Sequence, residues 1–337
     1  MVESQFNLMR RAVLAGTGIG LANRILPNSY FNETLGEDVD TWLRQNVEIY
    51  ERRWCDPSQS TVTLCLDAAR MALSNAGISP EDLNLIIIAT DTPEYISPST
   101  ASVVQYKLGA VNAATFDVNT ACAGFVSALD TASKYIAADP QYRYVLVIGA
   151  YAMSRYLNPK DKKTVTLFAD GAGAAVLRAE ESTDRGYLHG IQITQGQYFD
   201  WMGIYAGGTA QPVTPEILAE GDHYLKFVRK FPKELNPQMW TMMTHKVLRH
   251  IGRTPEDVRM FFMTQININS LRETMDNLSL PHDRAITIMH HYGYTGSAAI
   301  PTALHHAVTE GKVKPGDLIM LIGSGGGLAF AASAMIL

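Results

Sequence analysis

The chain carries an internal repeat, and this repeat limits the fold more than any other feature of the sequence. Residues 79–90 (SPEDLNLIIIAT) align with residues 254–265 (TPEDVRMFFMTQ) at an offset of 175 (254 − 79), which also places Gly77 on Gly252. Residues 145–149 (VLVIG) align with residues 319–323 (IMLIG) at an offset of 174 (319 − 145). Two matches in the same order at nearly the same offset predict two halves related by a pseudo-twofold axis.

Each half alternates strand-like and helix-like segments, and no low-complexity linker separates the halves. This alternation predicts an α/β fold built of helix and sheet layers. We place the N-terminal half at residues 1–180 and the C-terminal half at residues 181–337, fused into one domain. Residues 164–177 (TVTLFADGAGAAVL) are predicted to form two strands around a glycine turn at residues 170–173.

The strand ends of such sheets limit where chemistry can take place, since ligands of α/β folds bind beyond the carboxyl ends of strands. Four equivalent ends are expected to converge: after Thr90, at Cys122, after Gln265 and around residues 293–296. The glycine run at residues 323–327 (GSGGG) ends the last strand pair nearby. Its backbone N–H groups are candidate donors to an oxyanion. A glycine run more often forms only a tight turn.

Cys122 lies within residues 115–125 (TFDVNTACAGF), where a strand-like run gives way to small residues and then to a helix-length segment. A helix N-terminus favours a thiolate, and free backbone N–H groups there point at whatever the sulfur attacks. A lone cysteine is more often a buried structural residue. The small neighbours and the expected convergence of strand ends favour a nucleophile instead.

Charge and cysteine content exclude several classes of function. The chain has 28 Lys and Arg against 33 Asp and Glu, so it lacks the basic excess of a nucleic-acid-binding protein. Its three cysteines (Cys55, Cys65 and Cys122) form no CxxC motif and no paired framework, which favours a reducing cytoplasm. No segment is typical of a signal peptide, and no apolar run approaches the roughly 18 residues of a membrane span.

Several motifs together resemble β-ketoacyl-acyl-carrier-protein synthase III, a family of the thiolase superfamily. They are TACAGF, LFADGAGAAVL, HYLKF, TPEDV and the terminal GSGGGLAFA, and they run along essentially the whole chain in the right order. The resemblance implies a thiolase-like five-layer α-β-α-β-α core, a homodimer, and transfer of an acyl group from acyl-CoA to a cysteine. It implies no metal and no cofactor, with acyl-CoA as substrate and acyl carrier protein as a candidate partner.

The resemblance also assigns roles to individual residues. Cys122 matches the acyl-accepting nucleophile, and the Gly326 amide matches an oxyanion-hole donor that works with the Cys122 N–H. Trp42 matches a residue that stacks on coenzyme A, and its alternative role is that of a core anchor. Lys162 falls where the family often has an arginine near the nucleotide, and its alternative is a solvated charge. Arg272, in NSLRE, matches an arginine at the tunnel mouth.

Two departures from the family pattern affect the catalytic set. Where the family has the histidine of a motif like PHQANLR, this chain has ININSLR with Asn267, and where it has the asparagine of GNTSAAS, this chain has GYTGSAA with Tyr294. The resulting set is Cys122, Asn267 and Tyr294. Asparagine cannot act as a base near neutral pH, whereas histidine can. His290 and His291 are therefore candidate bases, the alternative being one buried and one exposed histidine in a strand before the loop.

Comparison with related enzymes of the superfamily does not decide which residue is the catalytic base. Thiolases place an asparagine where Asn267 lies and condense without decarboxylation. The run YTGS, which begins at Tyr294, is similar to hydroxymethylglutaryl-CoA synthase, which has a catalytic glutamate where Asp91 falls. We interpret Asp91 as an exposed loop acid ahead of Pro93 and regard it as a minor candidate for the base.

Three functions of different classes are compatible with these residues. The first is an acyltransferase that loads Cys122 from acyl-CoA and passes the acyl group to a second substrate, in fatty-acid-like or secondary metabolism. The second is a conventional decarboxylative synthase that uses malonyl thioester. The third is a non-catalytic partner subunit, against which the retained cysteine and the GSGGG run argue. The loss of the usual histidine and asparagine argues against the second, so the first is preferred.

Overall fold

Two large sheets form the framework of the protein, of which the computed structural model describes residues 10–337. The first sheet contains, in spatial order, β1 (Arg11–Leu21), β7 (Asp170–Glu180), β6 (Tyr144–Ala152), β4 (Leu85–Ala89) and β5 (Ala114–Val118). The second contains β11 (Met260–Met263), β12 (Leu318–Gly325), β13 (Ala329–Ile336) and β8 (Gly186–Thr194). All strands of the first sheet thus precede those of the second in the sequence.

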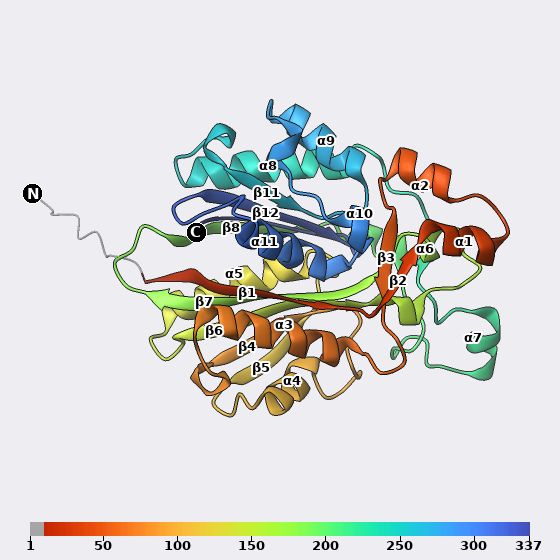
Figure 1. Ribbon diagram of the computed structural model, residues 1–337, viewed down its shortest axis with the longest axis horizontal. Helices are drawn as coiled ribbons and strands as arrows, with labels where there is room; N and C mark the ends of the chain where they lie inside the picture. Colours follow the sequence, from red (N-terminus) through yellow and green to blue (C-terminus); the bar gives the residue numbers. More distant parts are fainter. Residues whose placement is uncertain (1–9) are drawn as a thin grey trace, which may run out of the picture.

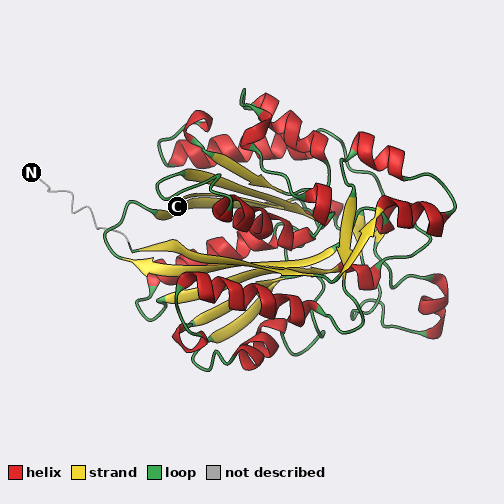
Figure 2. Ribbon diagram, in the orientation of Figure 1, coloured by secondary structure: helices red, strands yellow, loops and turns green. Residues whose placement is uncertain are grey.

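Helices cover both faces of each sheet and give five layers (Figures 1 and 2). The helices α3 (Thr61–Ala76) and α4 (Thr100–Leu108) lie outside the first sheet, while α8 (Leu235–His250) and α9 (Ile268–Asn277) lie outside the second. Between the sheets lie α5 (Gly124–Ala138) and α11 (Ala299–Thr309), which are buried on most sides. A single apolar cluster joins these two helices to both sheets, so the layers form one continuous core.

The two sheets repeat the same strand order, which confirms the predicted pseudo-symmetry. The series β1-β7-β6-β4 and β8-β13-β12-β11 both contain two antiparallel pairs followed by one parallel pair. The aligned segments before β4 and β11 each form a short 3-10 helix with a capping box, at Ser79 and Thr254. Gly77 and Gly252, at the ends of α3 and α8, both adopt φ of 67°. Only glycine adopts this left-handed conformation without strain, which explains the spacing of the two glycines.

Residues 164–177 differ from the two strands predicted around a glycine turn. The chain forms a short helix, α6 (Lys162–Val165), and then one uninterrupted strand, β7. The glycines lie inside this strand because α11 packs closely on it. A β-carbon on Gly173 would lie 2.7 Å from the backbone nitrogen of Thr302 and 2.8 Å from the Pro301 side chain. The glycines therefore permit close helix-to-sheet packing, which local sequence cannot distinguish from a turn.

Smaller elements gather at one end of the molecule, beyond one edge of the layers (Figure 1). They are β2 (Arg24–Pro27), α1 (Asn28–Leu35), α2 (Asp40–Asn46), β3 (Glu51–Trp54), β9 (Met202–Gly203), α7 (Pro215–Glu220), β10 (Lys226–Phe227) and α10 (Met289–Tyr292). Among residues 10–337, no helix has both the length and the apolar character needed to cross a bilayer.

Candidate active site

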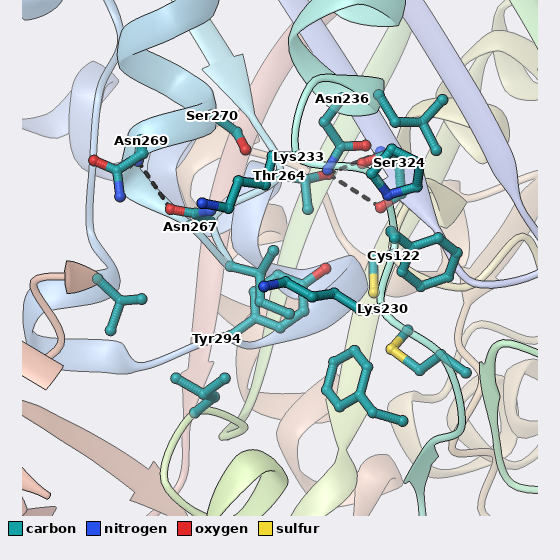
Figure 3. A pocket seen from close by; sticks show the side chains of 18 of the residues that line it. Cys122, Lys230, Lys233, Asn236, Thr264, Asn267, Asn269, Ser270, Tyr294 and Ser324 are labelled. Atoms are coloured by element: carbon teal, nitrogen blue, oxygen red, sulfur yellow. Dashed lines mark hydrogen bonds between the residues drawn. The ribbon is translucent and has the colours of Figure 1, made fainter. Parts of the chain in front are cut away.

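Residues from distant parts of the chain meet in one cavity of about 640 Å³. Cys122, Asn267, Tyr294, Gly326 and Trp42 all line it. In this order, they come from the turn before α5, the start of α9, the loop after α10, the β12–β13 turn and α2. Figure 3 shows the first three around the same hollow, with the ring of Tyr294 beside the sulfur of Cys122. The structure thus brings together four catalytic or oxyanion candidates and one candidate for coenzyme A binding.

Cys122 lies in a tight turn that is held by the glycine run of the other half. The preceding residue, Ala121, has φ of 46°, and Cys122 itself is only 2% exposed. A β-carbon on Gly325 would lie 2.5 Å from the backbone nitrogen of Cys122, so only glycine permits this contact. Gly326 follows at the turn and lines the same cavity as Cys122. The backbone at both positions therefore borders the cavity, as an oxyanion hole requires.

The thiol of Cys122 has a raised pKa, which contradicts the thiolate expected from its place before a helix. Burial is the largest cause, and the negative charge of Asp91 adds to it. The neighbouring Tyr294 hydroxyl and the residue's own backbone N–H act in the opposite direction and lower the pKa. The helix start gives less help than expected, because the N–H groups of Ala123 and Gly124 donate to the carbonyls of Thr120 and Ala121. The protonated thiol is the resting form at neutral pH.

Tyr294 is fixed on both sides by backbone hydrogen bonds. Its N–H donates to the Leu167 carbonyl, and its own carbonyl accepts from the Ala169 N–H, both at 2.9 Å. Its ring is buried between Tyr151 and Phe168. Burial, followed by the neighbouring Cys122, keeps the pKa of the phenol well above its usual value. Tyr294 therefore stays protonated, and its hydroxyl is available as a hydrogen-bond donor in the cavity that Cys122 also lines.

Asn267 is the N-cap residue of α9. Its side-chain oxygen accepts a hydrogen bond of 3.0 Å from the Asn269 N–H, which is drawn in Figure 3. This bond engages the amide oxygen and leaves the amide NH₂ group as the functional part that borders the cavity. Asn267, like Tyr294, is therefore suited to donate a hydrogen bond to a substrate oxygen and unsuited to accept a proton.

The two histidine candidates for the base do not reach this site. His290 and His291 lie on α10, a helix and not the predicted strand, and neither lines the cavity. The His290 Nδ1–H donates to the Glu48 carbonyl at 2.7 Å, so Nε2 accepts from the Thr287 hydroxyl at 3.1 Å. His291 is exposed and lies 3.4 Å from a Glu51 oxygen. Both rings are engaged outside the cavity, which corrects the expectation that one of them is the base.

The three residues assigned to coenzyme A binding have different positions. Trp42 is 53% exposed, which argues against a core anchor, and it also lines a second cavity of about 480 Å³. Lys162 lines this second cavity and forms an ion pair of 2.8 Å with Glu37. Trp42 therefore lies between the two hollows. Arg272 pairs with Glu48 at 2.7 Å and does not line either cavity.

Several residues that border the first cavity were not singled out from the sequence. They are Asn236, Thr264, Asn269, Ser270, Glu273 and Ser324, together with Lys230 and Lys233. The two lysines precede α8 in a segment without helical or strand periodicity, so no local pattern places them at the site. In Figure 3 both lysine side chains reach over the hollow that contains Cys122.

Asp91 differs from the exposed loop acid expected from the sequence. Its Oδ1 atom is buried and has no hydrogen-bond partner among residues 10–337. Burial raises its pKa to about 6. The charge of Asp91 in turn raises the pKa of Cys122. The sequence did contain a signal for this position. Asp91 follows the buried strand β4, and residues at the carboxyl ends of such strands often contact ligands.

We expect Tyr294→Phe to slow the alkylation of Cys122 by iodoacetamide about tenfold or more at neutral pH. The hydroxyl lowers the pKa of the thiol, so its removal raises that pKa and leaves less thiolate at a given pH. Alkylation rates over a pH series should show the rise in reactivity displaced to higher pH. Tyr292→Phe is the matched control, since this hydroxyl contacts His306 at 3.0 Å. Identical profiles for wild type and Tyr294→Phe would contradict the effect of this hydroxyl on the thiol.

Comparison with known proteins gives consistent matches along the chain. Residues 116–196 match the family 3-oxoacyl-[acyl-carrier-protein] synthase III, and residues 248–336 match its C-terminal part. The chain is 37% identical over 332 residues to the β-ketoacyl-[acyl-carrier-protein] synthase III of Caldanaerobacter subterraneus, covering 96% of this chain and 97% of the relative. It is 38% identical over 330 residues to an acetoacetyl CoA synthase of a Streptomyces species, covering 96% and 97%.

A solved structure extends the comparison to three dimensions. The crystal structure of 3-oxoacyl-[acyl-carrier-protein] synthase III from Aquifex aeolicus superposes with a TM-score of 0.87 at 32% identity. The match covers 97% of this chain and 100% of that chain. The five layers therefore belong to an architecture that is already known from experiment.

Proposed function

The chain belongs to the 3-oxoacyl-[acyl-carrier-protein] synthase III family, and from this premise we propose that it transfers an acyl group from acyl-CoA to Cys122 and then to a second substrate without decarboxylation. The observation that carries this proposal is the cavity wall. It combines a buried nucleophile with two hydrogen-bond donors, Asn267 and Tyr294, and no histidine of residues 10–337 lines it.

The first half-reaction loads the cysteine. The thioester carbonyl would enter between the backbone N–H groups of Cys122 and Gly326, which support the negative charge that develops on the oxygen. The sulfur attacks the carbonyl carbon, the bond to coenzyme A breaks, and the thiol proton leaves with coenzyme A as its free thiol. Trp42 borders both hollows and would contact the extended part of coenzyme A, with Lys162 near its charged end.

The side chains in the cavity do not favour decarboxylative condensation as the second half-reaction. Loss of CO₂ from a malonyl thioester leaves an enolate that two aligned donors must stabilise. Asn267 and Tyr294 are donors, but neither is the histidine that the family pattern has among these residues. We therefore favour an acceptor that needs no decarboxylation.

A conventional decarboxylative synthase is the second candidate. The names of the relatives at 37% and 38% identity favour it: one is a β-ketoacyl-[acyl-carrier-protein] synthase III and the other an acetoacetyl CoA synthase. The substituted pair at positions 267 and 294 argues against it. Acyl carrier protein is a candidate partner in either case, and Lys230 and Lys233 at the cavity would attract its phosphate-bearing arm.

The proposal is tested by separating the two half-reactions. Incubation with a panel of acyl-CoAs should release one equivalent of free coenzyme A thiol and add the acyl mass to the protein. The acylated enzyme is then given a second acyl-CoA, an amine or an alcohol, and product is measured together with CO₂. The absence of any acyl adduct across the panel would contradict the proposed function.

We further propose a homodimer formed around α4 and β5. β5 is an edge strand of the first sheet, and exposed apolar side chains lie nearby, with Ile96 88%, Tyr106 83% and Val111 72% exposed. Such a patch is typical of a protein interface, and a second copy would cover the edge. Sedimentation at micromolar concentration should give twice the chain mass.

A charged substitution tests which face carries this contact. Tyr106→Asp combined with Val111→Asp should shift the protein to a monomer, because two carboxylates would be buried without partners. Val213→Asp, at a position that is 54% exposed on a different segment, is the matched control and should leave the dimer intact. A wild-type monomer would refute the proposed dimer.

A further inference from the structure

Three consecutive carbonyl groups, those of residues 166–168, connect β3 to the loop that carries Tyr294. The first accepts a hydrogen bond of 2.6 Å from the guanidinium group of Arg52. The second accepts a bond of 2.9 Å from the backbone N–H of Tyr294, and the third accepts a bond of 3.0 Å from the indole N–H of Trp54. Two side chains of β3 therefore hold the outer carbonyls, and the middle carbonyl holds Tyr294.

The residue before Tyr294 packs directly on Arg52. A β-carbon on Gly293 would lie 2.6 Å from the β-carbon of Arg52 and 3.0 Å from that of Ala169. Gly293 has φ of 66°, a conformation that favours glycine. The Ala169 N–H donates to the Tyr294 carbonyl at 2.9 Å and closes the connection. Arg52 thus touches the loop itself and also holds the segment to which the loop is hydrogen-bonded.

Arg52 is fully buried, with 0% of its surface exposed, and neutral oxygen atoms accept its hydrogen bonds. Besides the carbonyl of residue 166, they are the Leu26 carbonyl at 3.1 Å and the side-chain oxygen of Asn28 at 2.7 Å. Its Nε atom has no partner among residues 10–337. Burial lowers the pKa of Arg52 to about 9, so the group is still charged at neutral pH.

A buried cation that is bonded only to neutral oxygens is costly, so Arg52 does more here than fill space. The planar guanidinium group can bind several oxygens at once in a fixed geometry, which lysine cannot do. Arg52 joins β2, the start of α1 and the segment after α6 in this way. The geometry of this junction therefore fixes where residue 167 presents its carbonyl to Tyr294.

The position of the Tyr294 hydroxyl depends on that backbone. The ring packs against Tyr151 and Phe168, and Figure 3 shows it beside the sulfur of Cys122. The hydroxyl lowers the pKa of the Cys122 thiol. A displacement of about 1 Å would weaken this effect, because the interactions of a hydroxyl group fall steeply with distance and angle.

From these contacts we infer that Arg52 is a positioning residue, which holds the Tyr294 hydroxyl in the cavity of Cys122 through the carbonyl of residue 166 and the backbone of Gly293. Arg52 does not line this cavity, so it acts through Tyr294 and not on a substrate. The inference rests on the proposed function only in taking Cys122 as the nucleophile. It extends the working site to β3, a strand outside the two large sheets.

Alkylation of Cys122 by iodoacetamide tests the inference without any acyl-CoA, with the Cys122 peptide quantified by mass spectrometry. Arg52→Met fills much of the same space and removes every donor. It should slow alkylation at neutral pH by about three- to tenfold and displace the pH profile upward, in the direction expected for Tyr294→Phe. In a Tyr294→Phe background the same substitution should change the rate by less than about twofold, because a residue that acts through the hydroxyl has no effect once the hydroxyl is gone.

Arg53→Met is the matched control. Arg53 is the next residue of β3, points to the other face of the strand, and donates to the Ala22 carbonyl at 3.3 Å. This variant should alkylate like wild type. Thermal unfolding shows whether Arg52→Met is folded. If it is not, Trp54→Phe removes only the bond to residue 168, and it should displace the profile in the same direction and have no effect in the Tyr294→Phe background.

Each outcome decides the inference. An unchanged profile in folded Arg52→Met, or in Trp54→Phe where Arg52→Met does not fold, overturns it. Equal slowing with and without the Tyr294 hydroxyl would assign the effect to charge or to general loosening and would also overturn it, as would an equally large shift in Arg53→Met. Failure of wild type to acylate with acyl-CoA would contradict the proposed function and leave the alkylation result standing.

Discussion

Replacement of Cys122 by alanine is expected to abolish covalent acylation by acyl-CoA. Removing the nucleophile leaves the oxyanion site intact but takes away the atom that forms the bond, and such losses reduce turnover by about 10⁴-fold or more. Intact mass after incubation with acyl-CoA should show the acyl adduct in wild type and none in Cys122→Ala. The alanine variant should fold normally, since only a sulfur atom is lost from the turn before α5.

The other two cysteines serve as matched controls. Cys65 is fully buried within α3, and Cys55 is buried beside Asp170. Neither thiol lines the cavity that contains Cys122, so neither is placed where an acyl-CoA would bind. Cys55→Ala and Cys65→Ala should each retain the adduct. An adduct that survives in Cys122→Ala would refute the assignment of the nucleophile.

The second large effect is expected from restoring the pair that the family has at positions 267 and 294. Loss of one aligned donor to an enolate or oxyanion costs roughly 3 kcal/mol, or about a hundredfold in rate. Wild type should therefore release CO₂ from malonyl thioester slowly, and the combined variant Asn267→His with Tyr294→Asn should release it about a hundredfold faster. The measurement is CO₂ release from malonyl-CoA by the acylated enzyme.

This double variant needs a folding control, because the Tyr294 ring is buried against Phe168 and Tyr151. Tyr294→Asn removes much of that contact and should lower stability by a few kcal/mol. Asn267→His alone replaces an N-cap and costs about 1 kcal/mol, so it is tested beside the double variant by thermal unfolding. Decarboxylation that is already fast in wild type, and unchanged in both variants, would contradict the role given to these positions.

The fold was predictable where the two halves constrain each other. The repeated TPEDV-like turns and the paired runs before β4 and β11 predict two similar sheets, and the structure has them. The strand β7 was mispredicted as two strands because its glycines accommodate α11, which arrives from the other half. Local patterns report the conformation that a segment prefers, whereas this contact depends on residues more than a hundred positions away.

The sequence predicted which residues form the site, but it did not predict their pKa values. Cys122, Asn267, Tyr294 and Gly326 meet as expected from the convergence of strand ends. The raised pKa of the thiol was not predicted, because it depends on burial and on the charge of Asp91. The Oδ1 atom of Asp91 is buried as well, although the sequence around it resembles an exposed loop. Burial and charge pairing arise only when the layers assemble.

The most direct test of the account gives acylated enzyme several acceptors side by side: malonyl-CoA, malonyl-carrier protein, a second acyl-CoA, an amine and an alcohol. Product and CO₂ are measured in each reaction, with Cys122→Ala as the blank. The account predicts product from an acceptor that carries no carboxyl group to lose, without release of CO₂. Rapid release of CO₂ with a β-keto product, at rates normal for condensing enzymes, would contradict it and identify a conventional decarboxylative synthase.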